Sequence, residues 1–338
     1  PQVSELAFAL RRQGIRVEPF PLTVAEAVNA LRSITEDGPG SALPRFASEG
    51  KICAVPPSSD HQPLLDVRGL SHQYPHATRP TLRDVTFSLA AGELVAIVGA
   101  NGAGKSTLAR HLVKILVPPP ATVFLRGRDL RAIPAAEVTR VVGYVFQYPE
   151  HQFVGATVLD DVAYGPRRAG LPDARAVALA QAMLDDFGLT HLGRAHPFSL
   201  SHGEQRRLSV AAMLVLGQAG LLLDEPTFGQ DRKNAAMLLD KLDALALEGR
   251  AIVAITHDMR LVAERAHRVL VMADGVLLFD GPPARLFADA SLLRRARLVA
   301  PPLWELGRQL DLPTLLVRVE DFVTWFQRRN SLVRSTER

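Results

Sequence analysis

Short apolar runs alternate with longer, mixed stretches through the middle of the chain. The runs that are predicted to be strands lie at 64–67, 85–89, 94–98, 141–146, 221–223, 251–255 and 269–272. They have the length and apolar content of buried strands, and the stretches between the later runs are predicted to be helical. This alternation predicts an α/β fold in which a largely parallel sheet is covered by helices.

A stretch rich in proline and glycine interrupts this pattern near the N-terminus. Residues 33–63 contain the runs Gly-Pro-Gly-Ser and Pro-Pro-Ser-Ser-Asp, a composition that resists packing. We interpret this stretch as a linker. It separates a short helical piece, residues 1–32, from the main body of the chain.

The two ends of the chain resemble each other. Residues 301–306 align with 1–6, Leu310 aligns with Leu10, and after a small gap 319–323 align with 24–28. We interpret residues 1–32 as the C-terminal tail of a preceding module in a tandem protein, missing upstream of Pro1, and the absent initiator methionine agrees with this. The alternative is a chance similarity between two short amphipathic helices.

Composition narrows the class of protein. With 338 residues, of which 47% are hydrophobic, the chain can bury one main α/β domain with smaller extensions. The longest apolar run, 211–223, is shorter than the roughly 20 residues of a membrane-spanning helix, and the N-terminus has no secretory signal. A single cysteine, Cys53, excludes an internal disulfide and suits a reducing cytosol. The net charge of +4 comes from scattered arginines, which indicates a solvated surface, with a patch for anionic lipid or nucleic acid as the alternative.

A phosphate-loop pattern, G-x-x-x-x-G-K-[ST], occupies residues 99–106. It comes directly after the apolar run 94–98 and before a predicted helix. Its glycines let successive backbone N–H groups converge on phosphates, and the helix N-terminus adds a partial positive charge. Lys105 is expected to neutralise β- and γ-phosphate oxygens, and the Ser106 hydroxyl to hold Mg²⁺.

An acidic pair, Asp224 and Glu225, ends the apolar run 221–223. Side chains at such a position emerge at the carboxyl edge of a parallel sheet, where ligands bind. Because adjacent carboxylates point to different sides, they can take different roles. Asp224 is expected to reach Mg²⁺ through water, and Glu225 to polarise the attacking water.

A Ser-x-Gly-Glu-Gln turn opens a predicted helix shortly before this acidic pair; its residues are Leu200, Ser201, His202, Gly203, Glu204 and Gln205. Together with the phosphate loop and the acidic pair, the turn resembles the signature of the ABC ATPase family, and the resemblance covers residues 64–285. It implies a P-loop NTPase fold of the ABC type with an antiparallel β subdomain, a helical signature subdomain and, at 286–338, a short helical C-terminal extension. The ATP-binding residues that it implies are Tyr74, Gly99, Ala100, Asn101, Gly102, Ala103, Gly104, Lys105, Ser106 and Thr107.

Four more positions match motifs of the family. Tyr74 resembles the aromatic residue that stacks on adenine, and Gln147 resembles the glutamine that links Mg²⁺ and water to the transmembrane partner. His257 resembles the switch histidine at the γ-phosphate, and Asp231 matches the D-loop aspartate that crosses to the neighbouring cassette. The resemblance therefore implies an ATPase whose catalytic residues are Glu225, His257 and Gln147, with Mg²⁺ near Ser106, Gln147 and Asp224.

Two motifs depart from the common family wording. His202 stands where the signature usually has its first glycine, which puts the competence of one ATP site in doubt. Phe228 and Gln230 replace small and apolar residues of the D-loop. In the family the signature acts on ATP held by another ABC ATPase domain, supplied by a homodimer, a heterodimer or a tandem partner. We therefore expect an intact ATP site on this chain and an altered site where His202 acts.

A finer resemblance lies in residues 146–153, 157–166 and 274–283. These segments are similar to the ATPase subunits of energy-coupling-factor transporters, which take up vitamins and transition-metal ions. The resemblance implies a peripheral protein on the cytoplasmic face of the cell membrane. Its partners would be an integral membrane transporter subunit, received by a groove after Gln147, and a separate substrate-binding membrane protein. The substrate stays open.

The strongest competing class is a soluble tandem ABC ATPase that acts on the ribosome or nucleic acid. Such proteins usually carry a long basic insert between cassettes. Here the stretch between the two modules, residues 33–62, is short, rich in proline and glycine, and poor in basic side chains. We therefore expect no nucleic-acid partner. A chromosome ATPase would need a long heptad run between the phosphate loop and the signature, and a GTPase would need an Asn-Lys-x-Asp motif; neither occurs. A chain that binds ATP but hydrolyses it only with its partner is the remaining alternative.

Overall fold

The computed structural model describes residues 2–13, 15, 17–18, 20–36, 62–310, 312 and 317–336. A six-stranded sheet forms its centre, in the order β10-β9-β3-β8-β7-β6. The strands are β3 (Leu94–Val98), β6 (Val142–Val145), β7 (Gly220–Asp224), β8 (Ala251–Ile255), β9 (Arg268–Ala273) and β10 (Val276–Gly281). All neighbouring pairs are parallel except β9 with β10, so the predicted largely parallel sheet is confirmed.

A second sheet is antiparallel and has the order β2-β1-β4-β5. Its strands are β1 (Leu65–His72), β2 (Leu82–Leu89), β4 (Val123–Leu125) and β5 (Arg128–Asp129). The predicted strands at 64–67 and 85–89 belong to this sheet, so they form the antiparallel β subdomain that the family resemblance implied.

Alternate residues of β3 face two different cores. Leu94, Ala96 and Val98 pack in a cluster with helices on one face of the main sheet. Val95 and Ile97 pack in a second cluster that includes the antiparallel sheet. Because successive side chains of a strand point to opposite faces, a strand covered on both faces is apolar at every position. This explains the uninterrupted apolar run at 94–98.

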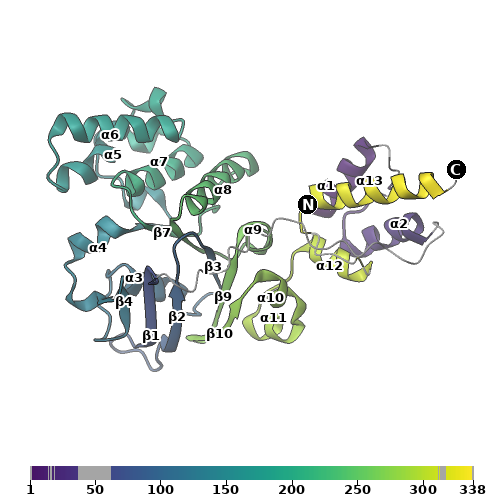
Figure 1. The fold of residues 1–338 in the computed structure, drawn as a ribbon, viewed down its shortest axis with the longest axis horizontal. Coiled ribbons are helices and arrows are strands. Elements are labelled where there is room, and N and C mark those ends of the chain that lie inside the picture. The colour runs from purple at the N-terminus through teal and green to yellow at the C-terminus, as the bar shows by residue number, and fades with distance from the viewer. Residues whose placement is uncertain are drawn as a thin grey trace.

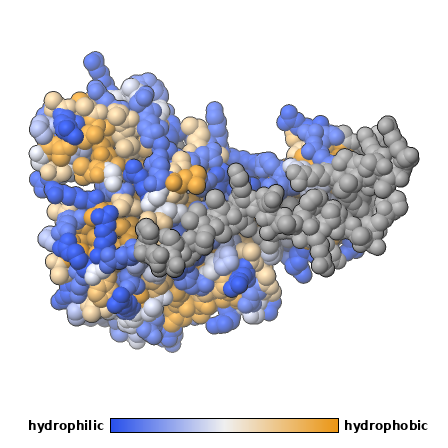
Figure 2. All heavy atoms as spheres, viewed as in Figure 1, coloured by the Kyte–Doolittle hydropathy of each residue, from blue (hydrophilic) through white to orange (hydrophobic). Residues whose placement is uncertain are grey.

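Helices cover both faces of the main sheet (Figure 1). They are α3 (Lys105–Leu112), α4 (Ala135–Val141), α5 (Val158–Arg168), α6 (Asp173–Asp186), α7 (His202–Leu214), α8 (Arg232–Leu247), α9 (Met259–Arg265), α10 (Pro283–Ala288) and α11 (Ala290–Ala296). Helices α5, α6 and α7 also pack against one another in a lobe at the upper left of Figure 1, which confirms the implied helical subdomain. On the face seen in Figure 2, apolar atoms gather on this lobe.

The remaining helices form a bundle beside the cassette, at the right of Figure 1. They are α1 (Gln2–Arg12), α2 (Val24–Glu36), α12 (Pro302–Gln309) and α13 (Val319–Thr336). Helix α1 packs against α13, and α2 packs against α12. The side chains of Leu6, Leu10, Leu306, Phe322 and Phe326 are buried between them. The two ends of the chain therefore share one apolar core.

Polar contacts join this bundle to the cassette. The Glu5 carboxylate pairs with Arg232 on α8 at 2.5 Å and with Arg260 on α9 at 3.8 Å. Arg318, which precedes α13, donates a hydrogen bond to the carbonyl oxygen of Glu264 on α9. These contacts hold the bundle against α8 and α9.

The predicted linker, residues 33–63, lies mostly outside the described residues, as does Cys53. At its start, α2 continues to Glu36. Among the helices of the described part of the chain, none is both long enough and apolar enough to cross a membrane.

Candidate functional site

The phosphate loop connects the central strand β3 to helix α3. Gly99 has φ +148°, and a Cβ there would lie 2.1 Å from the carbonyl oxygen of Met272. Gly104 has φ +101°, and its Cβ would lie 2.7 Å from the carbonyl oxygen of Thr81. Side chains at either position would collide with neighbouring backbone, so the loop conformation requires glycine. The predicted loop is thus formed by the residues that the sequence indicated.

Lys105 lies folded into this loop. Its Nζ donates hydrogen bonds to the carbonyl oxygens of Gly99, at 2.7 Å, and Ala100, at 3.1 Å, and the residue is 9% exposed. Burial lowers the pKa of Lys105, while the charges of Glu225 and Asp224 oppose this shift. The ammonium group is therefore held by carbonyl oxygens at the position from which it can reach a phosphate.

Asp224 accepts two hydrogen bonds at one carboxylate oxygen. Ser106 Oγ lies 3.2 Å from Asp224 Oδ2, and Tyr144 Oη lies 3.1 Å from the same atom. Burial, reinforced by the Asp224 charge, raises the pKa of Tyr144 well above its ordinary value, so its hydroxyl remains a donor at neutral pH. The structure thus brings Ser106 and Asp224 together, as predicted, and adds Tyr144, which was not predicted.

Glu225 points to the other side of the strand end. Its Oε1 lies 2.7 Å from His257 Nδ1, and its Oε2 accepts a hydrogen bond from Thr256 Oγ1 at 3.2 Å. The His257 side chain is 70% exposed, whereas that of Glu225 is 13% exposed. The mostly buried Glu225 carboxylate is therefore held by the Thr256 hydroxyl and by the exposed His257 imidazole. This arrangement can orient a water molecule.

Strand order explains why these residues meet. Strands β3, β8, β7 and β6 are consecutive neighbours in the sheet and run parallel. Their carboxyl ends carry the phosphate loop, His257, the acidic pair and Gln147, respectively. Parallel strands end at one edge of the sheet, and this edge is where open α/β sheets bind ligands.

Tyr74 lies at the rim of the phosphate loop. Its hydroxyl is 3.3 Å from Thr107 Oγ1, and its ring packs edge-on against His72 at a centroid distance of 4.7 Å. The buried ring of His111 lies 4.6 Å from that of His72. Burial lowers the pKa of His111.

The signature turn lies apart from the phosphate loop. Ser201 caps helix α7 through a capping box with Glu204, whose Oε2 accepts from Ser201 N at 2.8 Å. Among the described residues, no hydrogen bond joins residues 200–205 to the phosphate loop. Asp231 likewise caps its own helix, α8, by accepting from Asn234 N at 2.9 Å. Within the described part of the chain, neither the signature turn nor Asp231 forms a hydrogen bond with the phosphate loop.

The His202 imidazole packs against the D-loop of its own chain. A Cβ placed on Gly229 would lie 2.9 Å from His202 Cε1 and 3.2 Å from its Nε2. Gly229 has φ +71°. The His202 ring therefore lies where a side chain at residue 229 would collide with it, and glycine avoids this collision.

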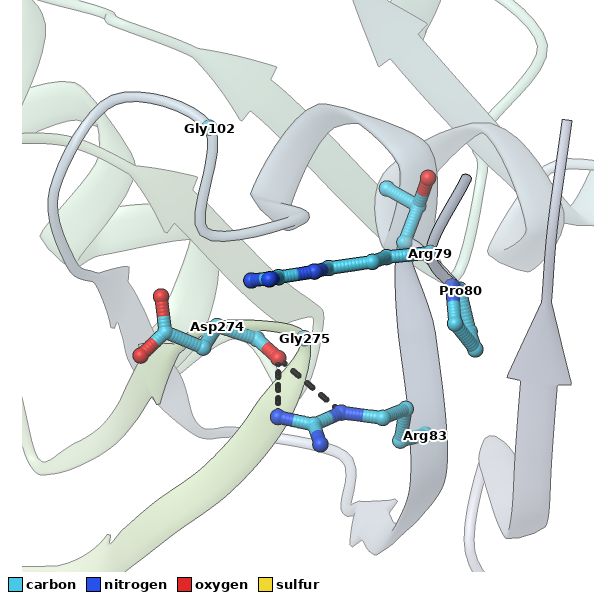
Figure 3. A pocket seen from close by; sticks show the side chains of 7 residues that line it. Arg79, Pro80, Arg83, Gly102, Asp274 and Gly275 are labelled. Carbon is cyan, nitrogen blue, oxygen red and sulfur yellow. Dashed lines mark hydrogen bonds between the residues drawn. The ribbon is translucent and has the colours of Figure 1, made fainter. Parts of the chain in front are cut away.

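A cavity of about 550 Å³ borders the phosphate loop at Gly102. Figure 3 shows the Arg79 side chain lying between Gly102 and the Asp274–Gly275 turn. Arg83 donates two hydrogen bonds to the carbonyl oxygen of Asp274, at 2.7 and 3.1 Å. Two guanidinium groups and the single carboxylate of Asp274 line this cavity, so its net charge is positive, which favours anionic ligands.

The sequence interpretation missed Tyr144 and Thr256. Tyr144 is the polar-tipped member of the apolar run 141–146, and its neighbour on the adjacent strand is Leu222. A parallel register between the runs 141–146 and 221–223 would have indicated its approach to Asp224. Thr256 directly precedes His257, so its place in the motif was the available signal.

Comparison with known proteins agrees with this geometry. Residues 82–228 match the ABC transporter family. A Bacillus subtilis protein named as a candidate ATP-binding protein for HMP/thiamine import is 42% identical over 72% of this chain and 43% of its own length. An energy-coupling factor transporter ATP-binding protein of Methanothermobacter thermautotrophicus is 36% identical over 76% of this chain and 83% of its own length.

A solved structure from Clostridium perfringens, cbiO1, described as part of the ABC transporter complex cbiONQ, has a TM-score of 0.63 at 29% identity. It matches 75% of this chain and 100% of its own. The chain spans 38 to 43% of the length of the first three curated relatives that it matches. On these similarities, and with the phosphate loop and acidic pair at one sheet edge, the chain belongs to the ATP-binding proteins of ABC transporters.

Proposed function

We propose that this chain binds ATP with Mg²⁺ and hydrolyses it to power a membrane transporter. The observation that carries the proposal is the pairing of Ser106 with Asp224 beside the pairing of Glu225 with His257. The first pair offers hydroxyl and carboxylate oxygens, and the second offers a general base. Both pairs border a loop whose backbone is shaped for phosphates.

The oxygen donors beside the loop fit Mg²⁺. Ser106 would supply a hard oxygen ligand of the kind that this ion prefers, and Asp224 would reach the ion through water; Gln147 follows the neighbouring strand. Within the described ranges, no group of three or more His, Cys, Asp or Glu side chains could hold a metal ion. A site with few protein ligands suits an ion that is bound mainly by phosphates and water. When bound, Mg²⁺ would neutralise charge on the β- and γ-phosphates.

The chain's own residues then divide the remaining work. Lys105 leaves the carbonyl oxygens of the loop and pairs with phosphate oxygens. Glu225 accepts a proton from the water that attacks the γ-phosphate, because Thr256 and His257 hold its carboxylate in place. His257 is exposed enough to contact the γ-phosphate as well.

A second ABC ATPase domain completes each site in this proposal. The signature turn at Leu200 to Gln205 makes no hydrogen bond to the described phosphate loop of its own chain, which supports a role on ATP held by a partner. The Asp231 side chain would approach the same interface. The partner cassette comes from a homodimer, a heterodimer or a tandem polypeptide.

We further propose that residues 1–32 are the tail of a preceding cassette. In the internal alignment, α1 corresponds to α12 and α2 to α13. In the structure each helix packs most closely against a helix of the other copy: α1 lies against α13, and α2 lies against α12. Two copies of one pair of helices that pack mainly against each other form a pseudo-symmetric arrangement. In this proposal the tails of two consecutive cassettes clamp each other.

The proposal also includes the class of the transported substrate. The relative named for HMP/thiamine import supports uptake of a vitamin, and uptake of a transition-metal ion stays the other expectation from the resemblance to energy-coupling-factor ATPases. Energy would pass from the groove after Gln147 to an integral membrane subunit at the cytoplasmic face of the membrane. A separate membrane protein would bind the substrate.

The test uses the full chain assembled with its partner cassette. Lys105→Ala should abolish ATP binding at this phosphate loop. Glu225→Gln should keep ATP binding and lower kcat by about 10²- to 10⁴-fold, because only the general base is lost. ATP binding and single-turnover hydrolysis measure the two effects. Hydrolysis by Glu225→Gln at the wild-type rate would remove the proposed base.

A further inference from the structure

Arg206 is a fully buried arginine in the first turns of the signature helix α7. It is 0% exposed, and its guanidinium donates five hydrogen bonds, all to backbone carbonyl oxygens. Burial lowers the pKa of Arg206 to about 10, and the charges of Asp224 and Glu225 oppose this, so the group stays charged at neutral pH. Burying a charge without a paired carboxylate is costly, and this arrangement persists because every donor direction is used.

The acceptors belong to two segments of the candidate site. Nη2 donates to the carbonyl oxygens of Asp224 and Glu225, each at 2.6 Å, and Nε donates to that of Pro226 at 3.2 Å. Nη1 donates to the carbonyl oxygens of Phe146 and Gln147. One side chain therefore ties the signature helix both to the acidic strand end and to the segment that carries Gln147.

The backbone at Glu225 needs such support. Its φ is +47°, a left-handed conformation that side chains other than glycine seldom adopt. Its N–H donates to the carbonyl oxygen of Ile255 at 2.8 Å, and its own carbonyl accepts from Phe228 N at 3.1 Å as well as from Arg206. Strained backbone at a functional residue persists only where its surroundings fix it. Arg206 supplies a charged contact on that carbonyl.

We propose that Arg206 is a positioning residue that fixes the Glu225 backbone and the start of the Gln147 segment to the signature helix. It touches neither nucleotide nor attacking water, and it acts through the carbonyl oxygens that it binds. Movement of the signature helix would then be transmitted to both segments at once. The effect of Arg206 on the rate of hydrolysis rests on the proposed ATPase function, whereas its effect on the backbone does not.

Arginine has the chemistry that this position requires. A guanidinium presents five N–H donors in a rigid plane, whereas an ammonium group presents three on a flexible stem. Lysine at this position would keep the charge and reach only some of the carbonyl oxygens, and methionine would fill the space without any donor. The graded pair Arg206→Lys and Arg206→Met therefore separates charge from geometry.

The first test does not depend on hydrolysis. Hydrogen exchange of the nucleotide-free full chain is followed by mass spectrometry in peptides covering 142–148 and 220–230. Arg206→Met should speed exchange in both peptides by about 10-fold or more, and Arg206→Lys by less, because charge-assisted bonds to both segments are lost. Arg250→Met is the matched control, since Arg250 also donates to a carbonyl oxygen, that of Gln218, away from the site. Unchanged exchange in Arg206→Met would overturn the inference.

The second test uses the full chain with its partner cassette. Counted per bound nucleotide, Arg206→Met should lower kcat by about 10²-fold and change KM by less than about 3-fold, with partial rescue by Arg206→Lys. In the Glu225→Gln background the same substitution should add less than about 3-fold, because both changes disable one group. Full additivity would reject action through Glu225. A wild-type chain without ATPase would instead contradict the proposed function, and the exchange result would still decide the role of Arg206.

Discussion

At the scale of single residues, one oxygen of Asp224 receives both the Ser106 and the Tyr144 hydroxyls. Tyr144 holds this carboxylate in one orientation and remains protonated because burial raises its pKa. Loss of a group that orients a carboxylate near a metal through a hydrogen bond typically costs about 10- to 100-fold in metal affinity or activity. The hydroxyl of Tyr144 should therefore matter for Mg²⁺ although it does not touch the ion.

Tyr144→Phe removes only this hydroxyl. We expect the apparent affinity for Mg²⁺ in the ATPase reaction to fall by about 10-fold, with ATP binding in the absence of Mg²⁺ unchanged. ATPase rates titrated with free Mg²⁺ measure the effect. Tyr164→Phe is the control, because Tyr164 is 47% exposed on α5. An unaltered Mg²⁺ dependence in Tyr144→Phe would show that Asp224 needs no such orientation.

The contact between His202 and Gly229 leads to a second prediction. Gly229→Ala should lower the free energy of unfolding by about 1–2 kcal/mol from the left-handed backbone alone, and the contact with the imidazole should add to this cost. In a His202→Ala background the added cost should disappear, giving a coupling of at least about 0.5 kcal/mol. Urea unfolding of the four proteins measures the cycle. Equal costs in both backgrounds would mean that the ring does not border this position.

Single residues also mark the limit of prediction from sequence. Asp224, Glu225, Lys105 and Ser106 could be assigned because a short motif fixes each beside a strand end. Arg206 could not, because its acceptors are backbone carbonyl oxygens up to 60 residues away, and such atoms leave no pattern in a sequence. The departure at His202 was visible, but its contact with Gly229 depends on how α7 packs beside the D-loop.

At the scale of elements, the start of α5 depends on a buried carboxylate. Asp161 is 4% exposed, and its Oδ1 accepts hydrogen bonds from Val154 N at 2.7 Å and Gly155 N at 2.8 Å. These bonds fold the segment after Gln147 onto α5. Burial raises the pKa of Asp161 above its ordinary value of 3.8, although both N–H groups oppose this.

This shift predicts a pH-dependent effect of Asp161→Asn. A raised pKa in the folded state means that the favourable contribution of Asp161 is complete below pH 3.8 and is lost as pH rises through the folded pKa. Asparagine keeps an acceptor oxygen for both N–H groups and carries no charge. Relative to wild type, the variant should therefore gain stability as pH rises above 3.8 through the folded-state pKa.

Urea unfolding at pH 4.5 and pH 7.5 measures this change, with Asp161→Ala as the control that loses the acceptor and is less stable at both values. A stability difference between Asp161→Asn and wild type that is independent of pH would contradict the prediction.

Strands were predicted best where both of their faces are covered by other parts of the molecule. The runs at 94–98, 251–255 and 221–223 became β3, β8 and β7 because strands covered on both faces are apolar throughout. The runs at 64–67 and 85–89 look alike in sequence, and only the family resemblance assigned them to a second, antiparallel sheet. Sheet membership depends on long-range pairing, such as Leu65 with Leu89, which a local pattern does not encode.

At the scale of the whole molecule, the two chain ends form one core although some 300 residues separate them. Leu6 and Leu306 are fully buried in the same cluster, as are Phe322 and Phe326. The hydrogen bonds and ion pairs to the cassette are partly exposed and contribute little each. Apolar burial therefore holds the N-terminal helices in place.

This packing predicts that α1 and α2 stay bound without their covalent link. A protease site engineered between residues 37 and 61 would cut the chain into 1–36 and the remainder. The N-terminal fragment should co-elute with the remainder in size-exclusion chromatography, since its apolar side chains are buried against α12 and α13. Leu306→Asp should release it, because an unpaired charge in this core costs several kcal/mol, about the stability of a small bundle. Phe8→Asp is the control, as Phe8 is 61% exposed on α1. Release of the fragment from the cut but otherwise unchanged protein would mean that the covalent linker, and not the shared apolar core, holds α1 and α2 in place. The proposed clamping of two cassette tails through this core would then be wrong.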